Sequence, residues 1–269
     1  MRNAGSKYSR ERGDISLEIT ENRSHYSAVS LSGGKDSTAL LIGMIERDMP
    51  IDCVLTAETG MEFPEFSGHL AKVDEYLHRE RGIHITTIRQ DVSFEYLMFE
   101  QPLITARGIN RRIERGLPPC GNGWPGPKVR WCTGRLKARP IEKEIKRLKK
   151  EKSAVQYIGI AADEAWRCKD AQYPLVEWGI TEAQALQICY DHGFDFGGLY
   201  KVYRRASCWC CPLQRLNELR SLRLYHPQLW KRLLEMDERA LAQFGSNALG
   251  RFRSDYTVAE LDKRFAREG

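Results

Sequence analysis

The sequence lacks any long apolar segment. No run in its 269 residues approaches the ~20 apolar residues that a membrane-spanning helix needs, and the first residues are polar and charged, without the apolar core of a secretion signal. We therefore expect a cytoplasmic protein with no membrane partner. In the absence of such a signal, the eight cysteines are not expected to form a disulfide framework, so they serve burial, catalysis or metal binding.

The sequence also has little net charge. It holds 42 Lys or Arg against 36 Asp or Glu, and its 42% hydrophobic and 29% charged residues are typical of a soluble chain with one large or two small domains. The basic residues are locally concentrated, because residues 135–152 hold nine of them and only three acidic ones. Such a segment binds nucleic acid or an anionic substrate, or forms the solvated face of a helix; charge does not choose between these.

Two well-known phosphate-binding motifs are missing, since the chain contains neither G-x-x-x-x-G-K-[ST] nor G-x-G-x-x-G. In their place, a Ser-Gly-Gly-Lys-Asp-Ser hexapeptide lies between the apolar run 28–31 and an apolar-periodic run that begins near Leu40. This pattern predicts a strand, a tight loop and a helix whose N-terminus favours an anion. The predicted phosphate-binding residues are Ser32, Gly33, Gly34, Lys35, Asp36 and Ser37.

The chain that follows alternates between strand and helix patterns. Apolar runs at 51–56, 83–88 and 154–160 predict further strands, and a helix pattern covers about 64–81. This alternation predicts the α/β class, with a doubly wound parallel sheet that binds ligands at the carboxyl ends of its strands. Glu58 and Thr59 follow the second strand, where the adenine or ribose of a nucleotide held by the loop would lie. Cys53, inside that strand, is expected to be buried.

The predicted organisation has three parts. Residues 1–24 are a polar lead-in, residues 25–170 form the nucleotide-binding domain, and residues 171–269 form a small helical C-terminal region. Helix signals in the last part are two capping boxes, at 181–184 and 257–260, and a proline that opens a helix at 227. Within the domain, an irregular insert at 100–135 is functional or disordered, and its Arg, Trp and Cys content favours function. A basic helix is expected to open after it at Pro140.

The cysteines suggest a metal site. Cys208 and Cys211, in the segment Cys-Trp-Cys-Cys-Pro at 208–212, have the C-x-x-C spacing that presents two sulfurs to one metal, while Cys120 and Cys132 lie in the insert. These four predict a centre that holds zinc or an iron–sulfur cluster, and spacing does not choose between the two. A redox pair is the alternative for Cys208 and Cys211. Cys189, inside a capped helix, is expected to serve packing.

Several further motifs accompany the loop. They are Glu58-Thr-Gly60 with Phe63-Pro-Glu65, Trp131-Cys-Thr133, Gly159-Ile160 with Asp163-Glu164 and Arg167, and Cys208 to Pro212. Over residues 26–215 the chain thereby resembles the phosphoadenosine phosphosulfate (PAPS) reductase family within the PP-loop ATP pyrophosphatase superfamily. The resemblance implies an adenine nucleotide alpha hydrolase-like fold and a nucleotide site that includes Gly159 and Arg167. Members of the family include sulfonucleotide reductases, a subunit of ATP sulfurylase and enzymes of DNA phosphorothioation, some with a [4Fe-4S] cluster.

Two departures from that family favour ATP over PAPS. True PAPS reductases end in a Glu-Cys-Gly-Leu-His segment with the nucleophilic cysteine, whereas this chain ends in Arg-Glu-Gly. They also usually alter the loop, because their nucleotide lacks a β-γ pyrophosphate, while the loop is intact here. We therefore expect an enzyme that cleaves ATP to AMP and pyrophosphate. The alternatives are a sulfonucleotide reductase and a non-catalytic module that binds nucleotide or nucleic acid.

The expected mechanism begins with attack of a substrate oxygen on the α phosphorus of ATP, and a sulfur nucleophile then displaces AMP. Lys35, expected as an exposed loop lysine, stabilises charge on the leaving pyrophosphate, and Asp36 orients the loop or helps to hold Mg²⁺. A sulfur-donor protein and nucleic acid are the candidate partners. The acceptor, the oligomeric state and the role of the cysteines are left open by the sequence.

Overall fold

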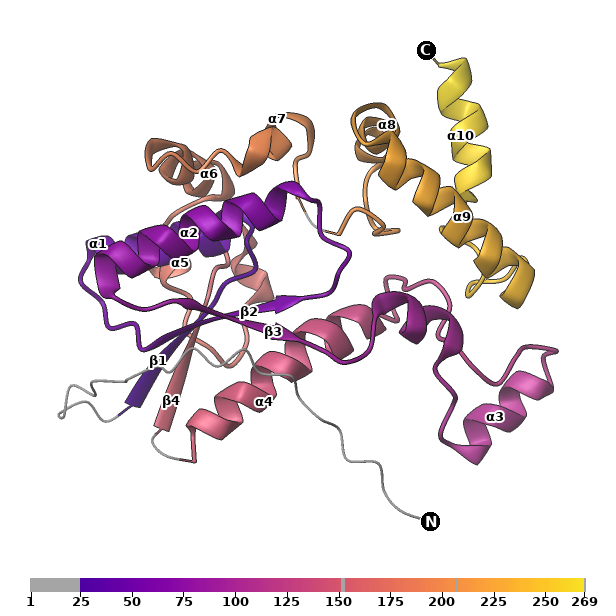
Figure 1. Cartoon of the computed structure of the whole chain (residues 1–269), viewed down its shortest axis with the longest axis horizontal. Coiled ribbons are helices and arrows are strands. Elements are labelled where there is room, and N and C mark those ends of the chain that lie inside the picture. The colour runs from indigo at the N-terminus through magenta and orange to yellow at the C-terminus, as the bar shows by residue number, and fades with distance from the viewer. Residues whose placement is uncertain (1–24, 151–152, 207, 269) are drawn as a thin grey trace.

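The computed structural model describes residues 25–150, 153–206 and 208–268, so the lead-in expected at 1–24 lies outside the described residues. Its centre is one four-stranded sheet in the order β3-β2-β1-β4. The strands are β1 (His25–Ser30), β2 (Cys53–Glu58), β3 (Ile85–Arg89) and β4 (Ser153–Ile158). Every neighbouring pair is parallel, and helices cover both faces of the sheet (Figure 1). The predicted doubly wound α/β fold is confirmed.

The two faces of the sheet bury different helices. On one face lie α1 (Lys35–Glu46), α2 (Glu65–Arg81), α5 (Pro174–Glu177) and α6 (Glu182–Asp191), with α1 packed against the other three. On the other face α4 (Arg139–Leu148) crosses all four strands, and its Ile141 and Ile145 pack against Ala28 and Leu55. Because both faces are covered, β1 is buried from Tyr26 to Val29, as is usual for a central strand of a parallel sheet.

The strand order places a crevice beside β1. The chain builds outward from β1 to β2 and β3, then returns to add β4 on the opposite side of β1. The direction of the strand order therefore reverses between β1 and β4, and open α/β sheets bind ligands at such a point, above the carboxyl ends of their strands. The loop at 32–37 follows β1, and the turn at 159–161 follows β4, so both border this crevice.

The insert contains more helix than its sequence suggests. It includes η1 (Tyr96–Glu100), a π-helical turn; α3 (Ala106–Ile113), capped by the Thr105 hydroxyl; and η2 (Thr133–Ala138), a second π-helical turn. α4 begins at Arg139, one residue before the expected Pro140. Since Pro140 has no N–H to donate to the carbonyl four residues before it, a wide turn precedes it here.

The C-terminal helices follow their sequence signals. After η4 (Phe196–Gly198) and α7 (Leu199–Val202) come α8 (Leu216–Tyr225), α9 (Pro227–Phe244) and α10 (Val258–Arg267), and α9 packs against both α8 and α10 (Figure 1). The capping boxes at Thr181 and Thr257 and the helix start at Pro227 are confirmed. Among the described residues, no helix is long and apolar enough to span a bilayer. The domain boundary at residue 170 stays a prediction.

Candidate nucleotide site and cysteine segment

The loop after β1 is held in shape by its own serines. The Ser32 and Ser37 hydroxyls lie 3.0 Å apart, and the Ser37 hydroxyl also accepts a hydrogen bond from the Ser32 N–H at 3.1 Å. Gly33 has a φ of +76°, a conformation that side-chain-bearing residues rarely adopt, so this position requires glycine. The sequence therefore folds into one rigid turn before α1 begins at Lys35.

Several loop amides have no acceptor. Within the described residues, no hydrogen-bond partner faces the backbone N–H groups of Gly33, Asp36 and Ser37, whereas the Lys35 N–H donates to the Tyr200 hydroxyl at 2.9 Å. Asp36 and Ser37 lie in the first turn of α1, where free N–H groups and the positive end of the helix dipole coincide. These amides are suited to bind an anion such as phosphate.

Gly159 packs directly against this loop. A Cβ on Gly159 would lie 2.6 Å from the Asp36 carbonyl oxygen and 2.6 Å from the Ser37 backbone nitrogen, closer than real Cβ contacts. The turn after β4 is therefore pressed against the first turn of α1, which closes the crevice at its base. Gly159, predicted as a nucleotide-site residue, lies at the loop because only a residue without a side chain fits there.

Three carboxylates converge at the mouth of the loop. Oxygens of Asp36, Glu164 in η3 (Ala162–Arg167) and Glu182 at the start of α6 all lie within 4.8 Å of one another. Burial is the main cause that raises the pKa of Asp36. For Glu182 burial acts in the same direction, but the Lys35 ammonium outweighs it and lowers the pKa. Oxygen ligands of this kind are the ones that Mg²⁺ prefers, so this donor set fits a magnesium ion.

Lys35 is buried, which corrects the expectation of an exposed loop lysine. Only 6% of the residue is exposed, and its ammonium lies 3.0 Å from Asp36 Oδ1 and 2.8 Å from Glu182 Oε1. Its charge therefore sits inside the acidic cluster. The reason is tertiary: α6 packs on α1 and brings Glu182 over the loop.

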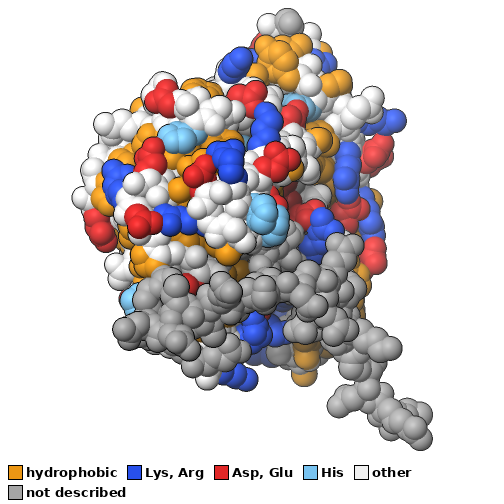
Figure 2. Space-filling view, turned by 60° about the vertical axis from the view of Figure 1, so that its left-hand side comes forward, with side chains coloured by type: hydrophobic (Ala, Val, Ile, Leu, Met, Phe, Trp, Pro, Cys, Tyr) orange, Lys and Arg blue, Asp and Glu red, His pale blue; other side chains and the backbone are white. Residues whose placement is uncertain are grey.

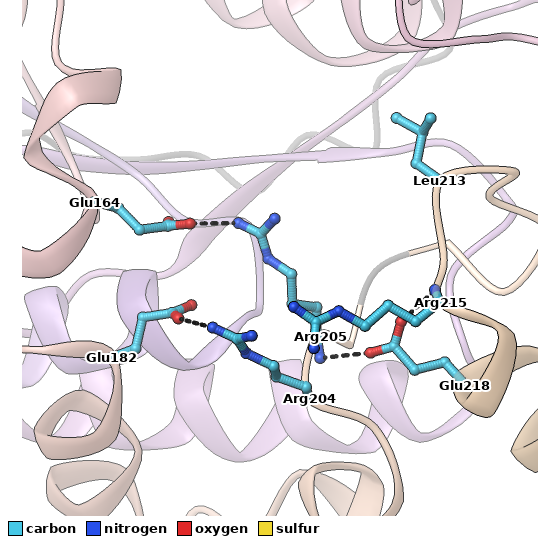
Figure 3. Close-up of a pocket in the computed structure, with 7 residues that line it drawn as sticks. All are labelled: Glu164, Glu182, Arg204, Arg205, Leu213, Arg215 and Glu218. Atoms are coloured by element: carbon cyan, nitrogen blue, oxygen red, sulfur yellow. Dashed lines mark hydrogen bonds and ion pairs between the residues drawn. The ribbon is translucent and has the colours of Figure 1, made fainter.

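Arginines close the opposite side of this cluster and form a cavity of about 270 Å³ with it. The Arg205 guanidinium lies 2.9 Å from Glu164, and the Arg204 guanidinium lies 3.5 Å from Glu182 (Figure 3). Glu218, at the start of α8, accepts hydrogen bonds from the backbone N–H groups of Arg205 and Arg215, so it fixes the backbone at both positions. The lining residues are Glu164, Glu182, Arg204, Arg205, Leu213, Arg215 and Glu218.

The cysteine segment joins the end of β2. Cys208 forms an isolated antiparallel bridge with Glu62, and the Trp209 N–H donates to the Met61 carbonyl at 3.0 Å. The buried Thr59 hydroxyl donates to Glu62 Oε1 at 2.7 Å and lies 3.8 Å from the Cys208 sulfur. Thr59, predicted to line the nucleotide, therefore faces Cys208 and links the end of β2 to the cysteines.

A half-buried lysine lies among the cysteines. Lys137, in η2, pairs with Glu62 at 3.4 Å, and although burial disfavours its charge, the fields of Cys208 and Glu62 raise its pKa. Burial raises the pKa of the Cys208 thiol, and the Lys137 ammonium partly offsets this effect. Burial also disfavours ionisation of Glu62, but the Lys137 charge and the Thr59 hydrogen bond hold the pKa of Glu62 below its usual value.

Three of the four predicted metal ligands share one neighbourhood. Burial is the main cause that raises the pKa of Cys211 to about 11, and Cys208 and Cys132 raise it in the same direction. Cys208 and Cys132 also both raise the pKa of Lys137. Cys120 has other neighbours: its sulfur lies 3.8 Å from the Gln243 side chain, and its backbone bridges Pro102.

The fit of these thiols to a metal depends on which metal is considered. Four thiolates bound to one zinc at about 2.3 Å lie within roughly 4 Å of one another. Among the described residues, no three cysteine sulfurs lie within 4.8 Å of one another, so the thiols do not form a zinc tetrahedron here. An iron–sulfur cluster binds its thiolates through different iron atoms and holds them farther apart. The four-cysteine metal centre stays a prediction.

The remaining predicted residues lie at the rim. Glu58 ends β2, and its side chain pairs with Arg89 at 2.5 Å. Arg167 ends η3 and pairs with Glu164, next to the acidic cluster. Cys189 is fully buried in α6, and Cys53 packs half-buried under α4, which confirms packing for the first and in part for the second.

Sequence reasoning missed several residues that surround the loop and the cysteines. They are Glu62, Lys137, Glu182, Tyr200, Arg204 and Arg205. Glu182 followed a capping threonine, where an acidic residue is explained by the helix dipole alone, and Lys137 lay in a basic run. Only a signal of spatial proximity, such as pairs that vary together among homologues, could have singled them out.

Comparison with known proteins adds little to what the structure shows. No family model matches the chain. The chain is 24% identical over 227 residues to an uncharacterized protein of Methanocaldococcus jannaschii, and the match covers 76% of this chain and 40% of that protein. The chain therefore spans well under half the length of this relative. The geometry of the site carries the functional argument.

Proposed function

We propose that this protein is a PP-loop enzyme of the PAPS reductase family that cleaves ATP to AMP and pyrophosphate and adenylylates an acceptor for sulfur transfer. The observation that carries the proposal is the set of unpartnered amides at Gly33, Asp36 and Ser37, placed beside three carboxylates at the switch point of the sheet. Free amides bind phosphate oxygens, and carboxylates bind the accompanying Mg²⁺. A magnesium nucleotide requires both.

The charges of the pocket suit departure of pyrophosphate. Asp36, Glu164 and Glu182 would hold Mg²⁺, which when bound neutralises phosphate charge. Lys35 lies between two of these carboxylates, and Arg204 and Arg205 lie beyond them. As the acceptor oxygen bonds to the α phosphorus and the bond to the β-phosphate oxygen breaks, these three cations stabilise the negative charge that pyrophosphate carries away.

The cysteine segment is proposed as the sulfur side of the reaction. Thr59 is in contact with Cys208 and lies just beyond the end of β2, so nucleotide and sulfur chemistry meet at the same edge of the sheet. After adenylylation, a sulfur nucleophile delivered by a sulfur-donor protein forms a bond to the acceptor carbon, and AMP leaves with its phosphate oxygen. Cys132, Cys208 and Cys211 are proposed to hold a metal centre, with Cys120 as a candidate fourth ligand.

The test is release of AMP and pyrophosphate from ATP in the presence of Mg²⁺, measured on anaerobically purified protein with metal and sulfide analysis. We expect both products in equal amounts, and tighter binding of ATP than of PAPS. Tighter binding of PAPS by tenfold, about 1.4 kcal/mol, would favour the sulfonucleotide reductase instead. Binding of ATP without any release of pyrophosphate, across candidate acceptors, would leave only a nucleotide-binding module.

A further inference from the structure

Residues 101–135, here called the basic arm, form the second basic segment of the chain beside the segment at 135–152. The basic arm carries seven Lys or Arg and one acidic residue, so the other 234 residues hold 35 of each sign and are neutral together. On the face shown in Figure 2, acidic and basic side chains are intermixed. The net charge of +6 of the whole protein therefore equals the net charge of this one segment.

The cations of the basic arm are largely unpaired. Within the part of the chain that the structure describes, the side chains of Arg107, Arg111, Arg115 and Lys128 make no ion pair, and all four are exposed. This contrasts with the arginines of the nucleotide pocket, such as Arg205, which is paired with a carboxylate. Exposed cations without nearby carboxylates repel one another, an arrangement that an anionic partner relieves.

The shape of the basic arm suits an extended partner. Figure 1 shows α3 at the edge of the molecule, away from the sheet, and no residue of α3 is buried. Arg107 and Arg111 lie four residues apart on one face of α3, about 6 Å along its axis, and Arg115 follows its end. The far end of the arm returns to the cysteine segment, because the charges of Arg130 and Cys132 both act on the pKa of Cys211.

We infer that the basic arm binds the phosphate backbone of a nucleic acid and guides it toward the cysteine segment. A row of unpaired arginines on an exposed helix supplies the sequence-independent contacts by which proteins hold phosphates. The identification of nucleic acid as the acceptor rests on the proposed function, whereas binding itself does not. An anionic membrane is the weaker partner, because α3 spans only about 12 Å and residues 101–119 contain no aromatic side chain.

The experiment is fluorescence anisotropy with labelled duplex DNA, single-stranded DNA and RNA, without ATP, at several salt concentrations. The triple variant Arg107→Gln, Arg111→Gln, Arg115→Gln should raise the Kd at low salt by tenfold or more. Its slope of log K against log salt should be shallower by about 0.9 for each lost phosphate contact on duplex DNA and about 0.7 on single strands. Its melting temperature should match the wild type, because these side chains are exposed.

A matched control removes the same charge elsewhere. The triple variant Lys72→Gln, Arg79→Gln, Lys231→Gln changes three exposed cations outside the arm, and it should keep at least a third of the wild-type affinity. The inference is overturned by absence of binding at low salt, by equal losses in the two triple variants, or by tighter binding to phosphatidylserine vesicles than to any nucleic acid. Pyrophosphate release without nucleic-acid binding would overturn the inference alone, and binding without release would overturn the proposed function alone.

Discussion

The loop pocket and the basic arm handle charge in opposite ways. In the pocket, Lys35 is buried between carboxylates, and each of Glu164 and Glu182 also meets an arginine. In the arm, Arg107 and Arg111 are exposed and unpaired within the described residues. The pocket therefore fits the proposed magnesium nucleotide, which carries an anion and a cation together, while the arm fits the extended anion proposed above. The cysteine segment lies between them, in contact with the end of β2 and with η2.

The difference shows which feature is informative in each region. Ion pairs inside the pocket fix the side-chain positions of individual residues. In α3 of the arm, no residue is buried, so the summed charge of its arginines matters. Single substitutions of charged side chains should therefore have large effects in the pocket and small ones in α3. The following predictions give the expected effects for the cysteines and for the pocket, beginning with the largest.

The cysteines give the largest expected effect. If Cys132, Cys208 and Cys211 share a metal centre, Cys→Ser at any of the three should remove most of the bound metal and lower the melting temperature, because metal binding is coupled to folding. Cys120→Ser decides whether the fourth ligand comes from the arm. Metal per protein and melting curves are the measurements.

The control for the cysteines is Cys189→Ser, which should keep the metal because Cys189 is buried in α6. A brown protein with broad visible absorption would indicate an iron–sulfur cluster, and a colourless one with stoichiometric zinc would indicate a structural zinc site. Full activity of a metal-free preparation, with Cys208 and Cys211 cycling between dithiol and disulfide, would restore the redox pair.

Lys35→Ala should lower pyrophosphate release by about 10²–10³-fold, the range seen when one group that stabilises transition-state charge is removed. Because Lys35 is buried with two carboxylate partners, the variant should also lose about 1.5–3 kcal/mol of stability. Product release and denaturant unfolding on the same preparation measure the two effects. Lys72→Ala, an exposed lysine on α2, is the control and should change neither; wild-type turnover in Lys35→Ala would remove Lys35 from catalysis.

His69 should make the stability of the folded protein sensitive to acid. It is 3% exposed, its ring lies among Phe66, Phe194 and Phe196, and its Nε2 is 3.1 Å from the Thr38 hydroxyl on α1. Burial lowers the pKa of His69 from 6.5 to about 4. Between pH 6.5 and about 4, His69 is therefore protonated in the unfolded chain but neutral in the folded protein. The free energy of unfolding has its full value above pH 6.5 and falls as the pH drops toward 4.

The loss attributable to His69 is at most about 3 kcal/mol, since one pKa unit corresponds to about 1.4 kcal/mol. His69→Phe should show less acid sensitivity, and the difference between the unfolding free energies of the two proteins across this pH range is the measurement. Identical pH profiles would show that His69 does not titrate between the folded and unfolded states as expected.

Gly159→Ala should lower stability by about 1–3 kcal/mol, because the new methyl group collides with the backbone of Asp36 and Ser37. ATP affinity should fall with it, since the loop amides shift. Gly68→Ala is the matched control, because a Cβ there meets nothing within 4 Å. Calorimetric ATP titration and melting curves decide; an unchanged affinity would place the nucleotide away from this contact.

The sequence by itself determined the local elements. The Gly-Gly turn, the apolar strands, the capping boxes at Thr181 and Thr257 and the start at Pro227 all appear in the structure as predicted, to within about three residues. These signals are local, because backbone preference, capping and hydrophobic period act over a few residues. The turn at 32–37 could be predicted for the same reason.

Only the tertiary structure decided what surrounds that loop. Lys35 and Glu182 are 147 residues apart in the chain, and Thr59 and Cys208 are 149 apart. The packing of α6 on α1 buries Lys35, and the bridge between Glu62 and Cys208 turns Thr59 toward sulfur. Neither fact is written in a local pattern, because burial and pairing of side chains depend on which distant elements share a sheet edge. The sequence could name the loop, but the charges that act on its ligand are set by long-range packing.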